Sequence, residues 1–107
     1  MQVALYHKSY NEQHLAEVKV EMQKRGAPVI RAIWSEVYEM WMAVEGCHRI
    51  RAAKDLGLTP IIKDISNAKT ATIQIDGENV KVKVSDLAIE MNDDLWKAHI
   101  VVFGDDE

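Results

Sequence analysis

The chain has 107 residues, of which 48% are hydrophobic and 28% are charged, and its formal net charge is −4. This size and composition suit a single domain over residues 1–107, and the lone Cys47 excludes an internal disulfide framework. No apolar run approaches the roughly 20 residues of a membrane span, and the opening MQVALYHKSY lacks the pattern of a secretory signal, so we expect a cytoplasmic protein without a membrane attachment.

The charge is divided unevenly along the chain. Residues 1–57 hold eight Lys or Arg against seven Asp or Glu, whereas residues 58–107 hold five against ten. An acidic second half repels phosphate backbones, and only Arg49, Arg51 and Lys54 form a local basic cluster. Direct binding of DNA is therefore not expected.

Apolar spacing and turn residues predict the first elements. Residues 3–6 form a short apolar strand, and Asn11 and Gly26 then serve as the N-cap and C-cap of a helix whose apolar residues recur at three and four positions. Residues 29–34 and 37–44 follow as two neighbouring strands with a short break between them.

The second half of the chain continues with shorter elements. The predicted order is a helix that begins at Cys47 and is closed by Gly57, a strand at 60–62, a hairpin of 70–75 and 79–84 around Asp76-Gly77, a helix capped by Ser85 through Met91, and a strand at 99–103. The expected fold class is α/β in the broad sense (α+β): a small mixed sheet with two or three short helices.

The sequence Glu45-Gly46-Cys47-His48-Arg49 lies where a predicted strand leads into the start of a helix. The first backbone N–H groups of a helix have no partner within it, and the helix dipole is positive there, which favours a phosphate. Gly46 allows close approach of an anion, and His48 and Arg49 add donors. Glu45 would hold Mg²⁺ on a nucleotide or act as a general base.

These residues, in this order, resemble the ParB/sulfiredoxin superfamily. The resemblance covers roughly residues 11–65, through the strand that follows Gly26-Ala27-Pro28, the Gly-Cys-His-Arg turn at 46–49, a helix with Arg, Ala, Leu and Gly at the family's spacing over 49–57, and Pro60-Ile61-Ile62. Residues 66–107 would complete the domain with the hairpin, short helix and final strand. The resemblance implies binding of ATP or another nucleoside triphosphate with Mg²⁺, with Gly46, His48 and Arg49 holding the phosphates.

The same turn points to two activities. Residues 46–49 match the sulfiredoxin signature, whose Cys works with ATP and Mg²⁺ to reduce an over-oxidised cysteine on a partner protein; this resemblance makes Cys47 catalytic. Glu45 instead resembles free-serine kinases and phage or plasmid ParB-like proteins, in which an acidic residue precedes the glycine. We therefore expect Mg²⁺-dependent hydrolysis or phosphoryl transfer with Glu45 catalytic, with a Cys47-dependent sulfinic acid reductase as the first alternative. A noncatalytic module that senses nucleotides or docks on protein or DNA is the second.

The accessory candidates are His14, Glu17, Arg31 and Arg51, and Glu21 is considered with Glu17. Arg31 and His14 would assist at the phosphates, and Arg51 would guide the nucleotide. Glu17 and Glu21 lie one helical turn apart, so they form either a metal or substrate-amine site or two solvated charges. No histidine pairs with Cys47 at metal-ligand spacing, so we expect no metal in the apoprotein and Mg²⁺ to arrive with the nucleotide.

Overall fold

The computed structural model describes residues 1–7 and 10–104 and contains a mixed sheet of five strands in the order β4-β2-β3-β1-β7. Strand β1 is parallel to β3 and antiparallel to β7, and β2 is antiparallel to β3 and parallel to β4. The bounds of these strands are β1 Gln2–Leu5, β2 Val29–Ser35, β3 Met40–Ala43, β4 Ile61–Asp64 and β7 His99–Val102.

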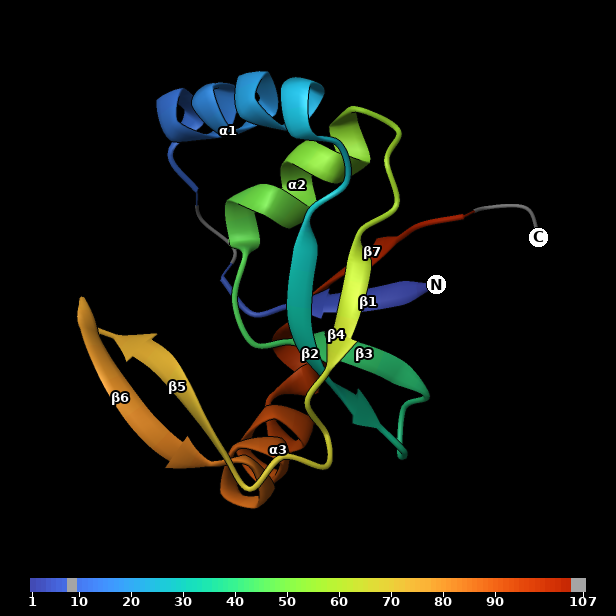
Figure 1. Cartoon of the computed structure of the whole chain (residues 1–107). Coiled ribbons are helices and arrows are strands. Elements are labelled where there is room, and N and C mark those ends of the chain that lie inside the picture. The colour runs from blue at the N-terminus through green and yellow to red at the C-terminus, as the bar shows by residue number, and fades with distance from the viewer. Residues whose placement is uncertain (8–9, 105–107) are drawn as a thin grey trace.

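Helices cover both faces of this sheet (Figure 1). Helices α1 (Glu12–Arg25) and α2 (Cys47–Asp55) pack on one face, and α3 (Val84–Asp93), followed by the short 3₁₀ helix η1 (Leu95–Lys97), packs on the other. The central strand β3 is accordingly buried from both sides, with Ala43 in the α1–α2 core and Met42 in the α3 core. The expected α+β domain with a mixed sheet is confirmed. None of the helices in the described residues has the length and apolar composition needed to cross a membrane.

The first helix begins and ends where its caps predict. The Asn11 side chain accepts a hydrogen bond from the His14 N–H at 2.8 Å. At the other end, the Gly26 N–H donates to the carbonyl of Met22, and Gly26 has φ +86°. Local side-chain chemistry therefore sets both limits of α1.

The predicted hairpin is also confirmed. Strands β5 (Thr70–Ile75) and β6 (Glu78–Lys83) form a separate two-stranded sheet that projects from the body beside α3 (Figure 1). Asp76 and Gly77 both have positive φ, as a tight two-residue turn requires.

Two local predictions are wrong. Residues 37–39 form a turn rather than a strand, because Ser35 accepts the Glu39 N–H at its carbonyl and the Tyr38 N–H at its hydroxyl. Ser85 is not an N-cap: α3 begins at Val84, so Ser85 lies inside the helix, with Lys83 at the cap position and no capping side chain.

Candidate functional site

The turn at Gly46 joins β3 to α2 and fixes the start of that helix. Gly46 occupies the N-cap position in the left-handed conformation, with φ 88° and ψ 32°. A Cβ atom placed there would lie 2.8 Å from Cδ1 of Ile30, so any other residue would strain the left-handed backbone and displace the Ile30 side chain. No side chain of the described residues caps α2, in contrast to Asn11 on α1. The start of α2 thus keeps the features of an anion site that the sequence predicts.

Glu45, just before this glycine, is held by Arg31 of strand β2. Arg31 Nε donates to Glu45 Oε2 at 2.8 Å, and Arg31 Nη2 donates to Glu45 Oε1 at 2.9 Å. These hydrogen bonds lower the pKa of the Glu45 carboxyl, and the nearby charges of Arg31 and Arg49 act in the same direction against a partial burial effect. Glu45 is therefore a firmly ionised carboxylate, which suits cation binding better than proton abstraction.

Arg31 also connects the turn to the projecting hairpin. Its Nη2 donates to the backbone carbonyl of Thr72 in β5 at 2.8 Å, in addition to its bond to Glu45. The guanidinium thus holds the hairpin over the end of the sheet. The sequence predicts an accessory role for Arg31, and the structure places it at the centre of the site.

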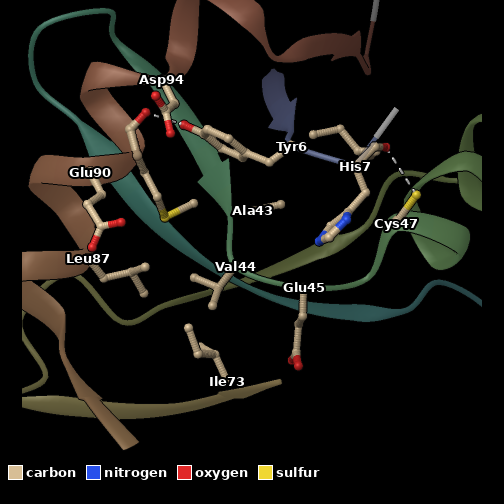
Figure 2. A pocket seen from close by; sticks show the side chains of 12 residues that line it. Tyr6, His7, Ala43, Val44, Glu45, Cys47, Ile73, Leu87, Glu90 and Asp94 are labelled. Atoms are coloured by element: carbon tan, nitrogen blue, oxygen red, sulfur yellow. Dashed lines mark hydrogen bonds between the residues drawn. The ribbon is translucent and has the colours of Figure 1, made fainter. Parts of the chain in front are cut away.

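A groove opens between the turn and the hairpin. Its larger part, of about 510 Å³, is lined by the turn and by β5, and includes Arg31, Glu45, Gly46 and Cys47. Its smaller part, of about 180 Å³, extends between the sheet and α3 (Figure 2). Cys47 lines both parts and lies with its Sγ 3.4 Å from the His7 carbonyl oxygen.

His48 and Arg49 are not among the described residues that line this groove. Nε2 of His48 accepts the backbone N–H of Asn11 at 3.0 Å, and its ring meets that of His14 edge-on at 4.5 Å. Arg49 donates to the Val29 carbonyl at 2.9 Å and has its Nη2 3.7 Å from Oε2 of Glu45. Their predicted side-chain contact with phosphate is not prearranged in this conformation.

The accessory residues on the helices have other neighbours. His14 Nδ1 lies 3.8 Å from Oε1 of Glu17, and Glu21 pairs with Arg25, all on the exposed side of α1. The Arg51 guanidinium lies over the Tyr10 ring, 4.5 Å from its centroid. The contacts of Glu17 and Glu21 on α1 agree with the interpretation of them as solvated charges.

The α3 side of the groove was not predicted from sequence. Tyr6, Glu90 and Asp94 line its smaller part, and the Tyr6 hydroxyl donates to the carbonyl of Met91 at 2.7 Å. Burial, with a further contribution from Asp94, raises the pKa of Tyr6, which stays protonated at neutral pH. No local sequence pattern marks these residues, because only the folded sheet brings them to the same groove as the glycine turn.

Comparison of the chain with protein-family models, curated proteins and solved structures finds no match in any of the three. Within residues 1–7 and 10–104, no group of three or more His, Cys, Asp or Glu side chains is placed to hold a metal ion. The site must therefore be interpreted from its own chemistry.

Proposed function

We propose that the chain binds the phosphates of a nucleoside triphosphate with Mg²⁺ at the Gly46 turn and hydrolyses the nucleotide or transfers its terminal phosphoryl group. The observation that carries this proposal is the start of α2, where left-handed Gly46 lines a groove of about 510 Å³ and no side chain of the described residues caps the helix. The resemblance of residues 45–49 to the ParB/sulfiredoxin turn supports the same chemistry.

The residues in the groove fit such a ligand. The first amides of α2 and the positive end of its dipole favour an anion at the turn. Arg31 adds a guanidinium on the groove wall. Glu45 supplies a carboxylate whose lowered pKa keeps it charged, and it would hold the Mg²⁺ of the nucleotide. Mg²⁺ neutralises charge on the phosphates when it is bound.

Two glycines allow a matched test of this site. Gly46→Ala places a Cβ 2.8 Å from Cδ1 of the buried Ile30 and so displaces the turn at the start of α2, whereas Gly57→Ala introduces the same left-handed strain where nothing lies within 4 Å. Calorimetric titration with ATP and with inorganic tripolyphosphate, each with Mg²⁺, should show binding by the wild type and by Gly57→Ala, and at least tenfold weaker binding by Gly46→Ala. Absence of tripolyphosphate and ATP binding by the folded wild type would refute the proposal.

Side-chain roles are tested on the same assay. We expect His48→Ala with Arg49→Ala to weaken binding, since phosphate would draw these side chains from their present contacts. Glu45→Gln should retain binding but lose phosphate release. Normal binding by the double variant would remove His48 and Arg49 from the phosphate site and leave the amides of α2 as its basis.

A second candidate function is favoured by the position of Cys47 in both parts of the groove. It is the sulfiredoxin-like reduction of a protein cysteine sulfinic acid, which uses ATP and an added thiol reductant. Cys47→Ser separates the two activities: phosphate release that survives this change supports phosphoryl transfer to another acceptor or to water. Nucleotide binding without turnover in the wild type would instead indicate a noncatalytic nucleotide sensor.

A further inference from the structure

We infer that the smaller part of the groove, between the sheet and α3, is a nucleobase pocket that selects bases carrying an exocyclic amino group. This inference rests on the proposed function and names the part of the nucleotide that lies beyond its phosphates. Three features of this pocket support the inference. The pocket is continuous with the proposed phosphate site, its volume suits a base, and its polar side chains gather on one wall.

The pocket is continuous with the proposed phosphate site. Both parts of the groove share the lining residues His7, Val44, Glu45, Cys47 and Ile73. A ligand whose phosphates lie at the start of α2 therefore extends into the smaller part without leaving the groove. Figure 2 shows Cys47 and His7 on one side of this space and α3 on the other.

The dimensions and walls of the pocket suit an aromatic ring system. Its volume is about 180 Å³, slightly above the ~150 Å³ of an apolar cavity that accepts benzene. Six of its lining residues are apolar: Leu5, Ala43, Val44, Ile73, Leu87 and Met91. Such walls favour a flat ring over a hydrated polyphosphate.

The polar side of the pocket offers hydrogen-bond acceptors. Glu90 lies on α3 and Asp94 directly follows that helix, both opposite Cys47 (Figure 2), and ionised carboxylates only accept hydrogen bonds. The Tyr6 hydroxyl is already used as a donor to the Met91 carbonyl. Adenine, guanine and cytosine present an amino group with two N–H donors to such a surface, whereas uracil and hypoxanthine lack this group and offer only a ring N–H on their pairing edge.

The same carboxylates also orient the nucleotide. Phosphates are repelled from Glu90, and less strongly from Asp94, whose Oδ1 lies 3.5 Å from Nζ of Lys97; they are attracted to the start of α2, so the two ends of the groove have opposite electrostatic preferences. Glu45, which lies between them, has its charge balanced by the two-point contact with Arg31. The base therefore occupies the α3 end and the phosphates occupy the turn.

The closing experiment compares nucleotides that differ by single groups. GTP and ITP differ only in the 2-amino group, and inorganic tripolyphosphate carries no base. With Mg²⁺ present, we expect the wild type to bind GTP, ATP and CTP about tenfold more tightly than ITP and UTP, the effect of one hydrogen bond to a charged acceptor. Tripolyphosphate should bind more weakly than GTP.

Three variants test which residues of the pocket cause the preference for amino-bearing bases. Glu90→Gln with Asp94→Asn replaces acceptor-only groups by amides and should bring GTP and ITP within about twofold of each other. Asp86→Asn with Asp93→Asn, on the same helix but outside the pocket lining, removes equal charge and should leave the preference intact. Leu87→Phe fills the pocket and should reduce GTP affinity to that of tripolyphosphate.

The outcomes separate this inference from the proposed function. Equal binding of tripolyphosphate and all nucleotides would refute the nucleobase pocket and leave the phosphate site standing. Tighter binding of nucleotides without any difference between GTP and ITP would refute the amino selection. Failure of tripolyphosphate and every nucleotide to bind would refute the proposed function itself, and the pocket assignment with it.

Discussion

The backbone N–H of Asn11 donates to Nε2 of His48 at 3.0 Å, which joins the N-terminal ends of α1 and α2. Nε2 accepts this bond only when it carries no proton. The pKa of His48 lies below its usual value because of burial first, and then because of the neighbouring His14 and Arg51. The contact between the two helices is therefore sensitive to pH.

The first prediction concerns this contact. Because the folded state lowers the pKa of His48, its contribution to stability is complete above the unfolded pKa of about 6.5 and decreases as the pH falls below it. Urea unfolding of the wild type should show this decrease between pH 7 and pH 5. His48→Gln, whose amide oxygen can accept the same N–H, should weaken the dependence of the unfolding free energy on pH. His99→Gln should leave this dependence unchanged. Identical slopes in all three proteins would contradict the prediction.

The second prediction concerns Arg31 and Glu45. Their side chains are 26% and 39% exposed, so solvent screens the pair and we expect a coupling free energy of about 1 kcal/mol in a double-mutant cycle of Arg31→Gln and Glu45→Gln. The exposed pair Glu21–Arg25, with one contact at 3.1 Å, is the control and should give roughly 0.3 kcal/mol. Equal coupling free energies in the two pairs would show that the two-point contact between Arg31 and Glu45 does not strengthen their interaction.

Glu45 also has a pH signature of its own. Its folded pKa is lowered, chiefly by the hydrogen bonds from Arg31, so its stabilising effect is present above the unfolded pKa and is lost as the pH falls through the folded value. We expect the acid limb of the stability curve to be shallower in Arg31→Gln than in the wild type. NMR titration of the Glu45 carboxyl carbon in the wild type and in Arg31→Gln measures this directly; a Glu45 titration unchanged by Arg31→Gln would contradict it.

The third prediction separates strain from collision in the two glycine turns. Gly57→Ala, at φ +73° with nothing within 4 Å, should cost about 1 kcal/mol of unfolding free energy from its left-handed backbone alone. Gly46→Ala adds a Cβ at 2.8 Å from Ile30 Cδ1 and should cost about 1–3 kcal/mol more. Ile30→Val shortens the colliding side chain, so Gly46→Ala should cost less unfolding free energy in the Ile30→Val background than in the wild type. An equal cost in both backgrounds would argue against the collision.

The fourth prediction concerns Ser35, a fully buried polar residue at the end of β2. Its hydroxyl donates to Oδ1 of Asn92 on α3 at 2.6 Å and accepts the Tyr38 N–H at 3.1 Å. Ser35→Ala removes the hydrogen-bond partner of both Asn92 and the Tyr38 N–H. It should lower the unfolding free energy by about 1–3 kcal/mol. Ser85→Ala, exposed and without a capping role, should change stability by less than about 0.5 kcal/mol. A cost for Ser35→Ala no larger than that of Ser85→Ala would show that this network is not stabilising.

Features set by nearby residues were predictable from the sequence. Asn11 and Gly26 limit α1 through contacts within one helical turn, and Asp76-Gly77 fixes the hairpin through its own backbone conformation. The turn at 37–39 was missed because its stabilising contacts come from Ser35, whose hydroxyl is itself positioned by Asn92 on α3. The pairing of β1 with both β3 and β7 likewise depends on contacts that no local pattern contains.

The candidate site also has one part that follows from neighbouring residues and another that depends on contacts between distant segments. The glycine turn could be located from sequence because a strand, a glycine and a helix start follow one another directly. The two-point contact of Arg31 with Glu45 and its bond to Thr72 join three segments separated along the chain, so the sequence identified Arg31 without its partners. Glu90 and Asp94 reach the groove only because α3 packs across the opposite face of the sheet from α2.

The position of β1 between β3 and β7 governs the order in which the protein is able to fold. Leu5 pairs with His99 and Gln2 pairs with Val102, so this ladder closes a loop of almost the entire described chain. During synthesis on the ribosome, the apolar residues of β1 remain without one neighbouring strand until β7 has emerged. Helices α1 and α2 form from local contacts, whereas the pairing of β1 with β7 carries the entropic cost of bringing two distant strands together, so we expect this pairing to be the slow step of folding.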